Sequence, residues 1–386
     1  MPVKYRCAVS SSSGPDDVSV AGAVKRRSVA IDLVRVIAIT AVVVRHTWYD
    51  PEGVVAQVIC PWAIAVFFVL TGYLWSSRKD LRQEIDSRAT GLLLPYAAWT
   101  VLISIPYFIW AYTSSGLQET AQELGLSQTA WATRLLLADV YGAQLMVLPF
   151  SVSWFFTVMF IAVVLLRFLG RYPRRLTWGI LAVVLVITVV APRVLWYLPL
   201  GAGLALVCML FIVLGQEFRK IRDRITRPLL AGVAALAAGS VAVWLGAAHD
   251  LDGELIEVKL SMYGFPVLGL LTGVVMSCGV ILVAEAVEPR IPQAAGPFIV
   301  EAATTATFSM FLHPCLLFLM GTPQTGRWPD FLVALIVPYV LAVVCLRRGW
   351  LPWLTGAARD PLPVADTIAR WPLIGRPWRS MVLDRA

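Results

Sequence analysis

The stretch RSVAIDLVRVIAITAVVVRHTWY, residues Arg27 to Tyr49, decides the fold. It has the length and apolar content of a membrane-spanning helix, yet it contains four polar residues that ionise: Asp32, Arg35, Arg45 and His46. Charged side chains that face lipid are costly, so such a helix is expected to turn them toward the inside of a bundle. The stretch therefore predicts a helical bundle in a membrane.

Three of these residues are expected on one face of the helix. At about 100° per residue, the eleven positions from Arg35 to His46 place both side chains on one stripe, about 16 Å apart. Asp32 lies one turn before Arg35 and is expected to pair with its guanidinium, which offsets the cost of burying that charge.

The composition favours a polytopic membrane protein. Of 386 residues, 59% are hydrophobic and only 15% are charged, which is too apolar for a soluble domain. The fold class predicted is all-α, with about ten spans of roughly 20 residues. They are expected at 29–49, 58–76, 91–112, 154–170, 177–191, 197–215, 229–248, 263–286, 301–320 and 331–347.

The flanking segments are expected to be tails. Residues 1–28 are rich in Ser, Gly and Ala and predict a mobile cytoplasmic tail, followed by the membrane domain over 29–348. Residues 349–386 predict an interfacial cytoplasmic tail. The longest outer segment, 113–153, contains an apolar run too short and too polar for an ordinary span. We expect it to form a lid or re-entrant piece that helps to choose an acceptor.

Basic residues indicate the orientation. If the N-terminus is inside, most Lys and Arg of the loops fall on the cytoplasmic side, in clusters at 78–88, 167–175 and 219–227. The outer loops hold only Arg134, Arg193, Lys259 and Arg327. This asymmetry predicts a cell-membrane protein with both termini in the cytoplasm. It also accounts for the net charge of +8, so we expect no nucleic-acid partner.

Metal and redox chemistry are not expected. The six cysteines and three histidines are scattered, without the spacing typical of a metal site. We interpret the cysteines as small apolar packing residues.

The ten residues between Arg35 and His46, with Asp32 just before them, resemble the first helix of the acyltransferase family 3 membrane proteins. VFFVLTGYLWS, residues Val66–Ser76, is similar to the family's second helix, with Thr71 in place of the usual Ser. Later segments that resemble the family are Arg88 with LLLPYAAW (Leu92–Trp99), Trp154-Phe155-Phe156, and FSMFLHP (Phe308–Pro314). The resemblance covers roughly residues 28–348, and the first-helix motif is its most specific part.

The resemblance implies transfer of an acyl group, most simply acetyl from acetyl-CoA, to a hydroxyl of a glycan or glycosylated small molecule. His46 is expected to be the general base. Arg35 would bind an anionic group of the acyl-CoA or stabilise the oxyanion. Arg88 would bind coenzyme A phosphates. The alternative is that Arg88 only belongs to the excess of basic residues on the cytoplasmic side. The supporting residues are expected to be Asp32, Tyr73, Trp154 and His313, and no permanently bound cofactor is expected.

Other interpretations remain open at this point. The charges of the first helix also suit a secondary transporter with an intramembrane proton or substrate site, although they are not repeated in two halves of the chain. A receptor or scaffold without activity is a third class. His46 is alternatively a packing residue, and Arg45 is expected either to extend to the outer interface or to contact the acceptor.

Overall fold

The computed structural model describes residues 28–50, 53–113, 121–142, 145, 148–248, 256–264, 266–356 and 361–370. Within these ranges the chain forms helices and no strand, which confirms the all-α prediction. Its α-helices are α1 (Val29–Thr47), α2 (Val54–Ala63), α3 (Ala65–Tyr73), α4 (Leu81–Arg88), α5 (Leu94–Thr113), α7 (Gln128–Tyr141), α8 (Trp154–Leu169), α9 (Arg174–Val190), α10 (Pro192–Trp196), α11 (Ala202–Ile221), α12 (Pro228–Ala248), α13 (Pro266–Val287), α14 (Ala295–Thr304), α15 (Ala306–Leu319), α16 (Trp328–Arg348), α17 (Pro352–Thr355) and α18 (Val364–Arg370). Shorter helical turns are η1 (Ala89–Leu93), η3 (Pro199–Gly201), η4 (Arg222–Arg224), η5 (Val258–Leu260) and η6 (Glu288–Arg290).

The chain is a multi-pass membrane protein, but its long spans are fewer than expected. Five described segments are long and apolar enough to cross a membrane: Leu81–Thr113, Pro199–Arg224, Pro228–Gly246, Val267–Arg290 and Trp328–Arg348. A sixth results if α14 and α15, which meet at 69°, form one bent span. The predicted count of about ten is therefore not confirmed.

The other predicted spans are helical but short, interrupted or charged. The span predicted at 58–76 is divided between α2 and α3 at Ile64. The helices α8 and α9 have 16 and 17 residues, fewer than the roughly 20 that cross a bilayer unaided. The charges of α1 separate it from an ordinary lipid-facing span.

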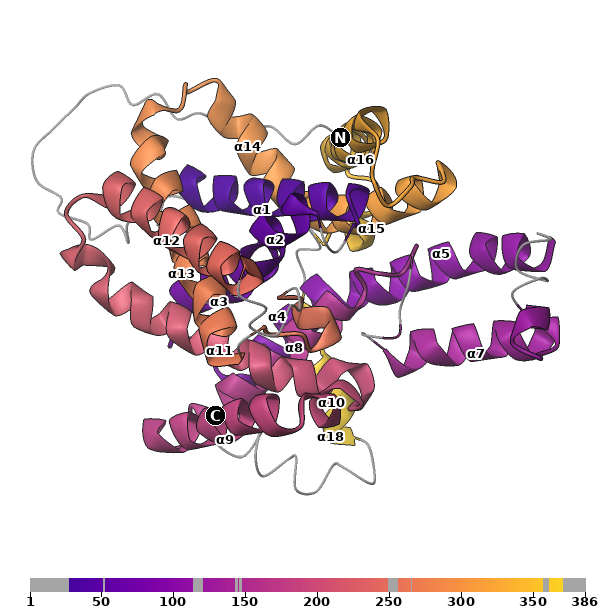
Figure 1. Cartoon of the computed structure of the whole chain (residues 1–386), viewed down its shortest axis with the longest axis horizontal. Coiled ribbons are helices and arrows are strands. Elements are labelled where there is room, and N and C mark those ends of the chain that lie inside the picture. The colour runs from indigo at the N-terminus through magenta and orange to yellow at the C-terminus, as the bar shows by residue number, and fades with distance from the viewer. Residues whose placement is uncertain are drawn as a thin grey trace, which may run out of the picture.

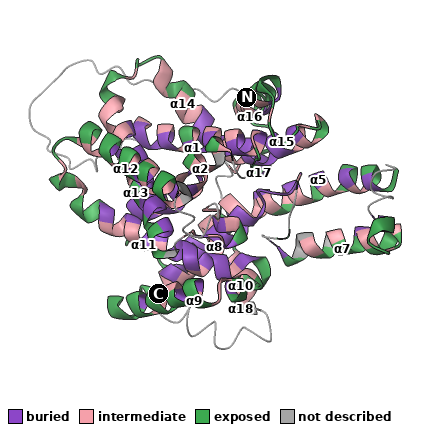
Figure 2. Cartoon of the chain, viewed as in Figure 1, coloured by how far each residue is buried: buried purple, intermediate pink, exposed green. Residues whose placement is uncertain are grey.

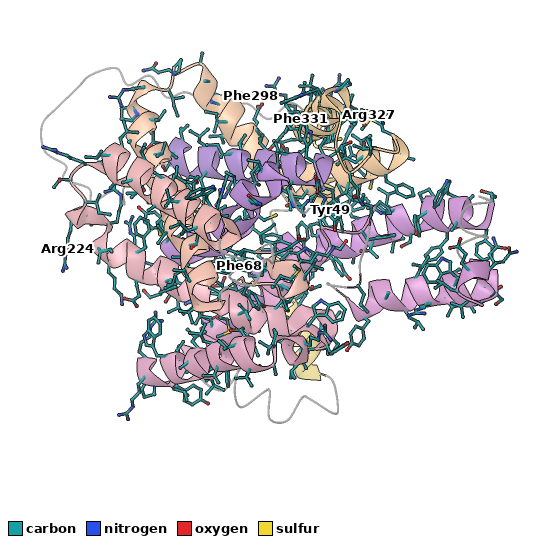
Figure 3. The ribbon with its side chains drawn as sticks, in the orientation of Figure 1. Tyr49, Phe68, Arg224, Phe298, Arg327 and Phe331 are labelled. Atoms are coloured by element: carbon teal, nitrogen blue, oxygen red, sulfur yellow. The ribbon has the colours of Figure 1, made fainter. Side chains whose placement is uncertain are left out.

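Helix α1 lies inside the bundle. It packs against α2, α13, α14, α15 and α16, and Figure 1 shows it crossing the molecule among these helices. In Figure 2, buried residues concentrate on α1, α8 and α11, while α9, α12 and α16 present exposed faces. Figure 3 places Phe68 inside the bundle and Phe298 and Arg224 at its rim. The exposed faces of α12 and α16 are apolar, as contact with lipid requires.

Two glycines allow α3 and α11 to approach closely. A Cβ on Gly72 would lie 1.9 Å from the carbonyl oxygen of Ile212, and a Cβ on Gly215 would lie 2.1 Å from that of Val69. Small residues at such crossings bring two backbones into direct contact, which is the usual way that helices associate in membranes.

The structure describes the predicted C-terminal tail in part and almost none of the predicted N-terminal tail. Apart from Ser28, the predicted N-terminal tail lies outside the described residues. Of the predicted C-terminal tail, α17 and α18 are described, and both pack on the membrane domain. Leu354 O in α17 accepts a hydrogen bond from Trp99 Nε1 at 3.0 Å, and Ala365 N in α18 donates one to Asp86 Oδ1 at 2.8 Å.

Candidate active site

Helix α1 holds three of the predicted site residues. Asp32 is fully buried, and its Oδ1 accepts a hydrogen bond from Arg35 Nη1 at 2.7 Å. The expected pair across one turn is therefore present. His46 follows near the C-terminal end of the same helix.

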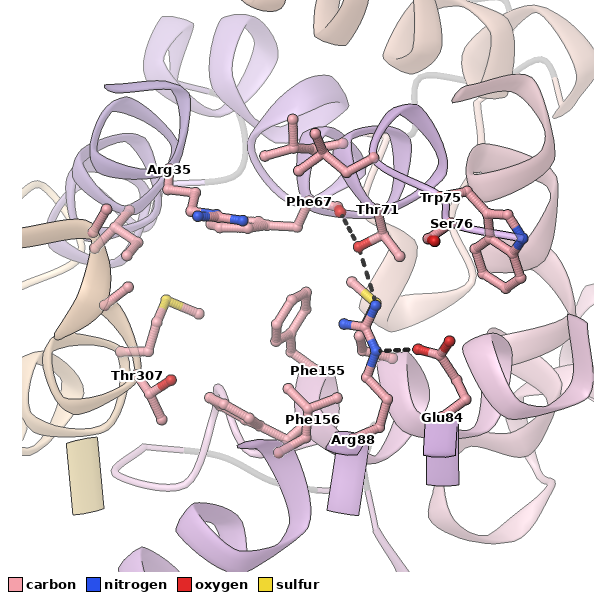
Figure 4. A pocket seen from close by; sticks show the side chains of 18 of the residues that line it. Arg35, Phe67, Thr71, Trp75, Ser76, Glu84, Arg88, Phe155, Phe156 and Thr307 are labelled. Carbon is pink, nitrogen blue, oxygen red and sulfur yellow. Dashed lines mark hydrogen bonds and ion pairs between the residues drawn. The ribbon is translucent and has the colours of Figure 1, made fainter. Parts of the chain in front are cut away.

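One cavity, of about 370 Å³, is lined by Arg35, and we call it the inner cavity. Its volume is within the range of small-molecule sites, about 300–1,000 Å³. Figure 4 shows Arg35 and Arg88 entering it from different sides, with Phe155 and Phe156 nearby. Its described charged lining residues are four cations and one carboxylate: Arg35, Lys79, Arg88, Arg167 and Glu84. This lining suits a ligand with several phosphates.

Glu84 fixes two of these arginines. Its carboxylate is 2% exposed, and it accepts hydrogen bonds from Arg88 Nε at 2.9 Å and from Arg167 Nη2 at 2.7 Å. Arg167 also lies 4.2 Å above the ring of Trp75. Sequence reasoning missed Glu84 and Arg167, because Arg167 was assigned to the basic residues that indicate topology and Glu84 was given no role. The available signal was the spacing of four residues between Glu84 and Arg88, which places the two on one helix face.

A second cavity, of about 420 Å³, is lined by His46, and we call it the outer cavity. Ser151 Oγ lies 3.3 Å from His46 Nδ1, and Trp154 lines the cavity at the start of α8. The predicted lid segment, 113–153, contributes Ser151 and its neighbours. Its helix α7 instead projects from the bundle beside α5, and none of its residues is among the described lining residues (Figure 1).

Arg45 is buried at this cavity and does not extend to an outer interface. Its Nη2 lies 3.2 Å from Glu257 Oε2, and its Nε donates to Cys60 Sγ at 2.8 Å. Its guanidinium carbon lies 4.6 Å from the centre of the Tyr49 ring. Arg45 lines the cavity instead of extending to an outer interface, and its contact with an acceptor stays a prediction. Cys60, interpreted as a packing residue, lines the same cavity.

His313 lies directly against His46. The two ring centroids are 5.1 Å apart, with an angle of 73° between the planes. His313 is fully buried, and its Nδ1 lies 2.9 Å from Ser309 O. A carbonyl oxygen only accepts, so Nδ1 of His313 carries the proton and its Nε2 keeps a lone pair when the ring is neutral. That Nε2 has no hydrogen-bond partner among the described residues.

The two cavities share a wall. Phe155 on α8 and Met310 on α15 line both of them. Along α1, Arg35 in its first half lines the inner cavity and His46 in its second half lines the outer one.

Tyr73 lies outside both cavities. It is buried, its hydroxyl donates to Glu285 Oε1 at 2.6 Å, and it accepts from Arg219 Nη1 at 3.2 Å. These contacts join α3, α11 and α13. Tyr73 therefore holds these three helices together. Of the two aromatic residues predicted to support the site, Tyr73 and Trp154, only Trp154 lines a cavity.

Within the described ranges, no three His, Cys, Asp or Glu side chains are placed to hold a metal ion together. The bundle of apolar helices thus encloses one cavity whose described charged lining residues are mainly cations and one cavity beside a buried histidine pair. An acyltransferase domain model, that of acyltransferase family 3, matches residues 28–347. The chain belongs to this family, and the protein is a membrane acyltransferase. Neither the curated proteins nor the solved structures gave a match.

Proposed function

We propose that the protein transfers an acyl group, most simply acetyl, from acyl-CoA in the inner cavity to a hydroxyl of a glycan or glycosylated small molecule in the outer cavity. The observation that supports this proposal is the shared wall of Phe155 and Met310 between the two cavities. A donor and an acceptor bound in them would have only these two side chains between their reacting atoms, and the reaction requires the two side chains to turn aside so that the hydroxyl reaches the thioester.

The inner cavity suits the donor. Coenzyme A carries phosphates, and guanidinium groups bind phosphate oxygens through paired, charge-assisted hydrogen bonds. Arg35, Arg88 and Arg167 are held by the carboxylates of Asp32 and Glu84. Their positions are therefore set before the ligand arrives, which reduces the ordering cost of binding.

His46 is the proposed general base. With Nδ1 directed to Ser151, Nε2 is the nitrogen that takes the proton from the acceptor hydroxyl. The hydroxyl oxygen attacks the thioester carbonyl carbon, the carbon–sulfur bond breaks, and the thiolate of coenzyme A takes the proton from His46. An ester and a free thiol are the products.

The orientation belongs to the same proposal. The basic clusters at 78–88, 167–175 and 219–227 support an orientation in which the inner cavity faces the cytoplasm and both termini lie on that side of the cell membrane. The donor would then enter from the cytoplasm, and the acceptor from the outer side.

Purified protein, labelled acetyl-CoA and a panel of sugars test the function. The expected result is release of free thiol together with labelled sugar ester. Sugar accumulation in vesicles without thiol release would support transport instead and would contradict the proposal.

A further inference from the structure

Helix α4 lies between the inner cavity and the C-terminal part of the chain. Glu84 and Arg88 line the cavity, and Figure 4 shows the ion pair that joins them. Arg82 and Asp86 stand two positions before and after Glu84, so they lie about 160° from it around the helix. The helix therefore directs one side toward the cavity and another side away from it.

The side of α4 that faces away from the cavity binds residues 352–356 and 361–370, which we call the C-terminal clamp. Arg82 forms an ion pair with Asp366, and Asp86 Oδ1 accepts a hydrogen bond from Ala365 N at 2.8 Å. Ala365 is fully buried, in a small apolar cluster with side chains of α4. The first N–H groups of a helix have no acceptor within it, so the Asp86 carboxylate stabilises the start of α18.

The C-terminal clamp also contacts the turn that follows α4. This turn, η1, is a π-helix, in which the regular α-helical hydrogen bonds are interrupted. Thr90 Oγ1 accepts a hydrogen bond from Leu362 N at 2.7 Å and donates one to Asp86 O at 2.8 Å. A Cβ on Gly356 would lie 3.4 Å from the carbonyl oxygen of Gly91, so the two backbones are close. The hydroxyl of Thr90 therefore joins α4, η1 and the C-terminal clamp.

We propose that the C-terminal clamp positions the arginines of the inner cavity without contacting the ligand. No residue of the clamp is among the described lining residues of either cavity. The clamp holds α4 and η1, α4 carries Arg88, and Glu84 of the same helix fixes Arg167. Asp86 and Thr90 are therefore positioning residues. The inference rests on the proposed function only for the identity of the ligand, acyl-CoA.

Steady-state kinetics of coenzyme A release test the positioning. Thr90→Val removes the hydroxyl and keeps the shape of the side chain. The change acts on the placement of Arg88 and not on the chemical step, so the KM for acetyl-CoA should rise about threefold to tenfold while kcat changes little. Thr90→Ser keeps the hydroxyl and should keep the parent KM. A purely structural defect would instead lower the apparent kcat, because less protein is folded, and leave KM unchanged.

Thr133→Val is the matched control. The Thr133 hydroxyl also donates to a carbonyl four residues earlier, Thr129 O, at 2.8 Å. It is exposed on α7, which contributes no described lining residue to either cavity, so its KM should equal that of the parent protein. An unchanged KM in Thr90→Val, or an equal rise in Thr133→Val, would overturn the proposal.

A double variant shows whether the clamp acts through Arg88. In an Arg88→Ala protein the clamp has one arginine fewer to position, so adding Thr90→Val should raise KM less than it does in the parent protein. The same fold-change in both backgrounds would contradict positioning of Arg88.

A thiol at the inner cavity tests the positioning without acyl transfer. Ser76→Cys introduces an exposed thiol among the lining residues. It is treated with an anionic (sulfonatoethyl) and a cationic (trimethylammonium-ethyl) methanethiosulfonate, and peptide mass spectrometry locates the adduct. The anionic-to-cationic rate ratio should fall about twofold or more when Thr90→Val is added, because a displaced guanidinium changes the local potential, and should not change with Thr90→Ser. An unchanged ratio with Thr90→Val would overturn the proposal. A ratio that falls in a protein that does not cleave acetyl-CoA would refute only the proposed function.

Discussion

Arg35 and His46 share a helix but line different cavities. Arg35 and His46 are separated by about 16 Å along the axis of α1. The guanidinium of Arg35 pairs with Asp32, which lies one turn further from His46. Helical side chains lean toward the N-terminus, which does not shorten this separation. We therefore favour a contact of Arg35 with a remote part of the donor over stabilisation of an oxyanion next to His46.

Replacing His46 by Ala should lower kcat by about 100- to 10,000-fold, the usual contribution of a positioned general base. The change removes no ion pair and adds no polar atom, so insertion and folding should be retained. Initial rates of thiol release, with size-exclusion profiles as a folding control, measure both. Full activity in a well-folded His46→Ala protein would contradict the assignment.

At the scale of elements, α4 and η1 set the position of Arg88 in the inner cavity. Arg88→Ala should raise the KM for acetyl-CoA several-fold and change kcat little, because a phosphate contact far from the thioester is made about equally in the ground and transition states. Glu84 keeps Arg167 as a partner, so the helix should remain folded. Steady-state kinetics over a range of acetyl-CoA concentrations measure the effect. An unchanged KM would mean that Arg88 only contributes to the excess of basic residues on the cytoplasmic side.

The contact between α3 and α11 should be intolerant of a single methyl group. Gly72→Ala places a Cβ 1.9 Å from Ile212 O, which the helices can relieve only by separating. We expect a loss of about 1–3 kcal/mol or more, typical of overpacking, measured as a lower Tm in detergent. The control is Gly179→Ala on α9, where no atom lies within 4 Å of the added carbon. Equal Tm values for the two variants would contradict the role of this contact.

At the scale of the whole molecule, charge asymmetry predicts which cavity faces the cytoplasm. An impermeant thiol reagent applied to intact cells should label Gln324→Cys, at the mouth of the outer cavity, and should label Lys79→Cys only after permeabilisation. Labelling of Lys79→Cys in intact cells would reverse the orientation.

Sequence patterns predicted the helical class, the family and the Asp32–Arg35 pair, because periodicity and spacing along one helix fix them locally. They did not predict the number of long spans, since apolar content alone does not show where a helix ends or bends, as at Ile64 and between α14 and α15. The contacts of Arg45 with Glu257 and of Glu84 with Arg167 join residues distant in sequence. No local pattern reveals such pairs.

The wall of Phe155 and Met310 also has an electrical consequence. If the cavities open to opposite sides, much of the membrane potential, worth about 2.3 kcal/mol per charge at 100 mV, falls across these two side chains. In the proposed reaction the acetyl group passes outward and the proton taken up by His46 returns to the coenzyme A thiolate, while the charged coenzyme stays on one side. Transfer therefore moves no net charge across the membrane, and an energised membrane neither drives nor opposes it.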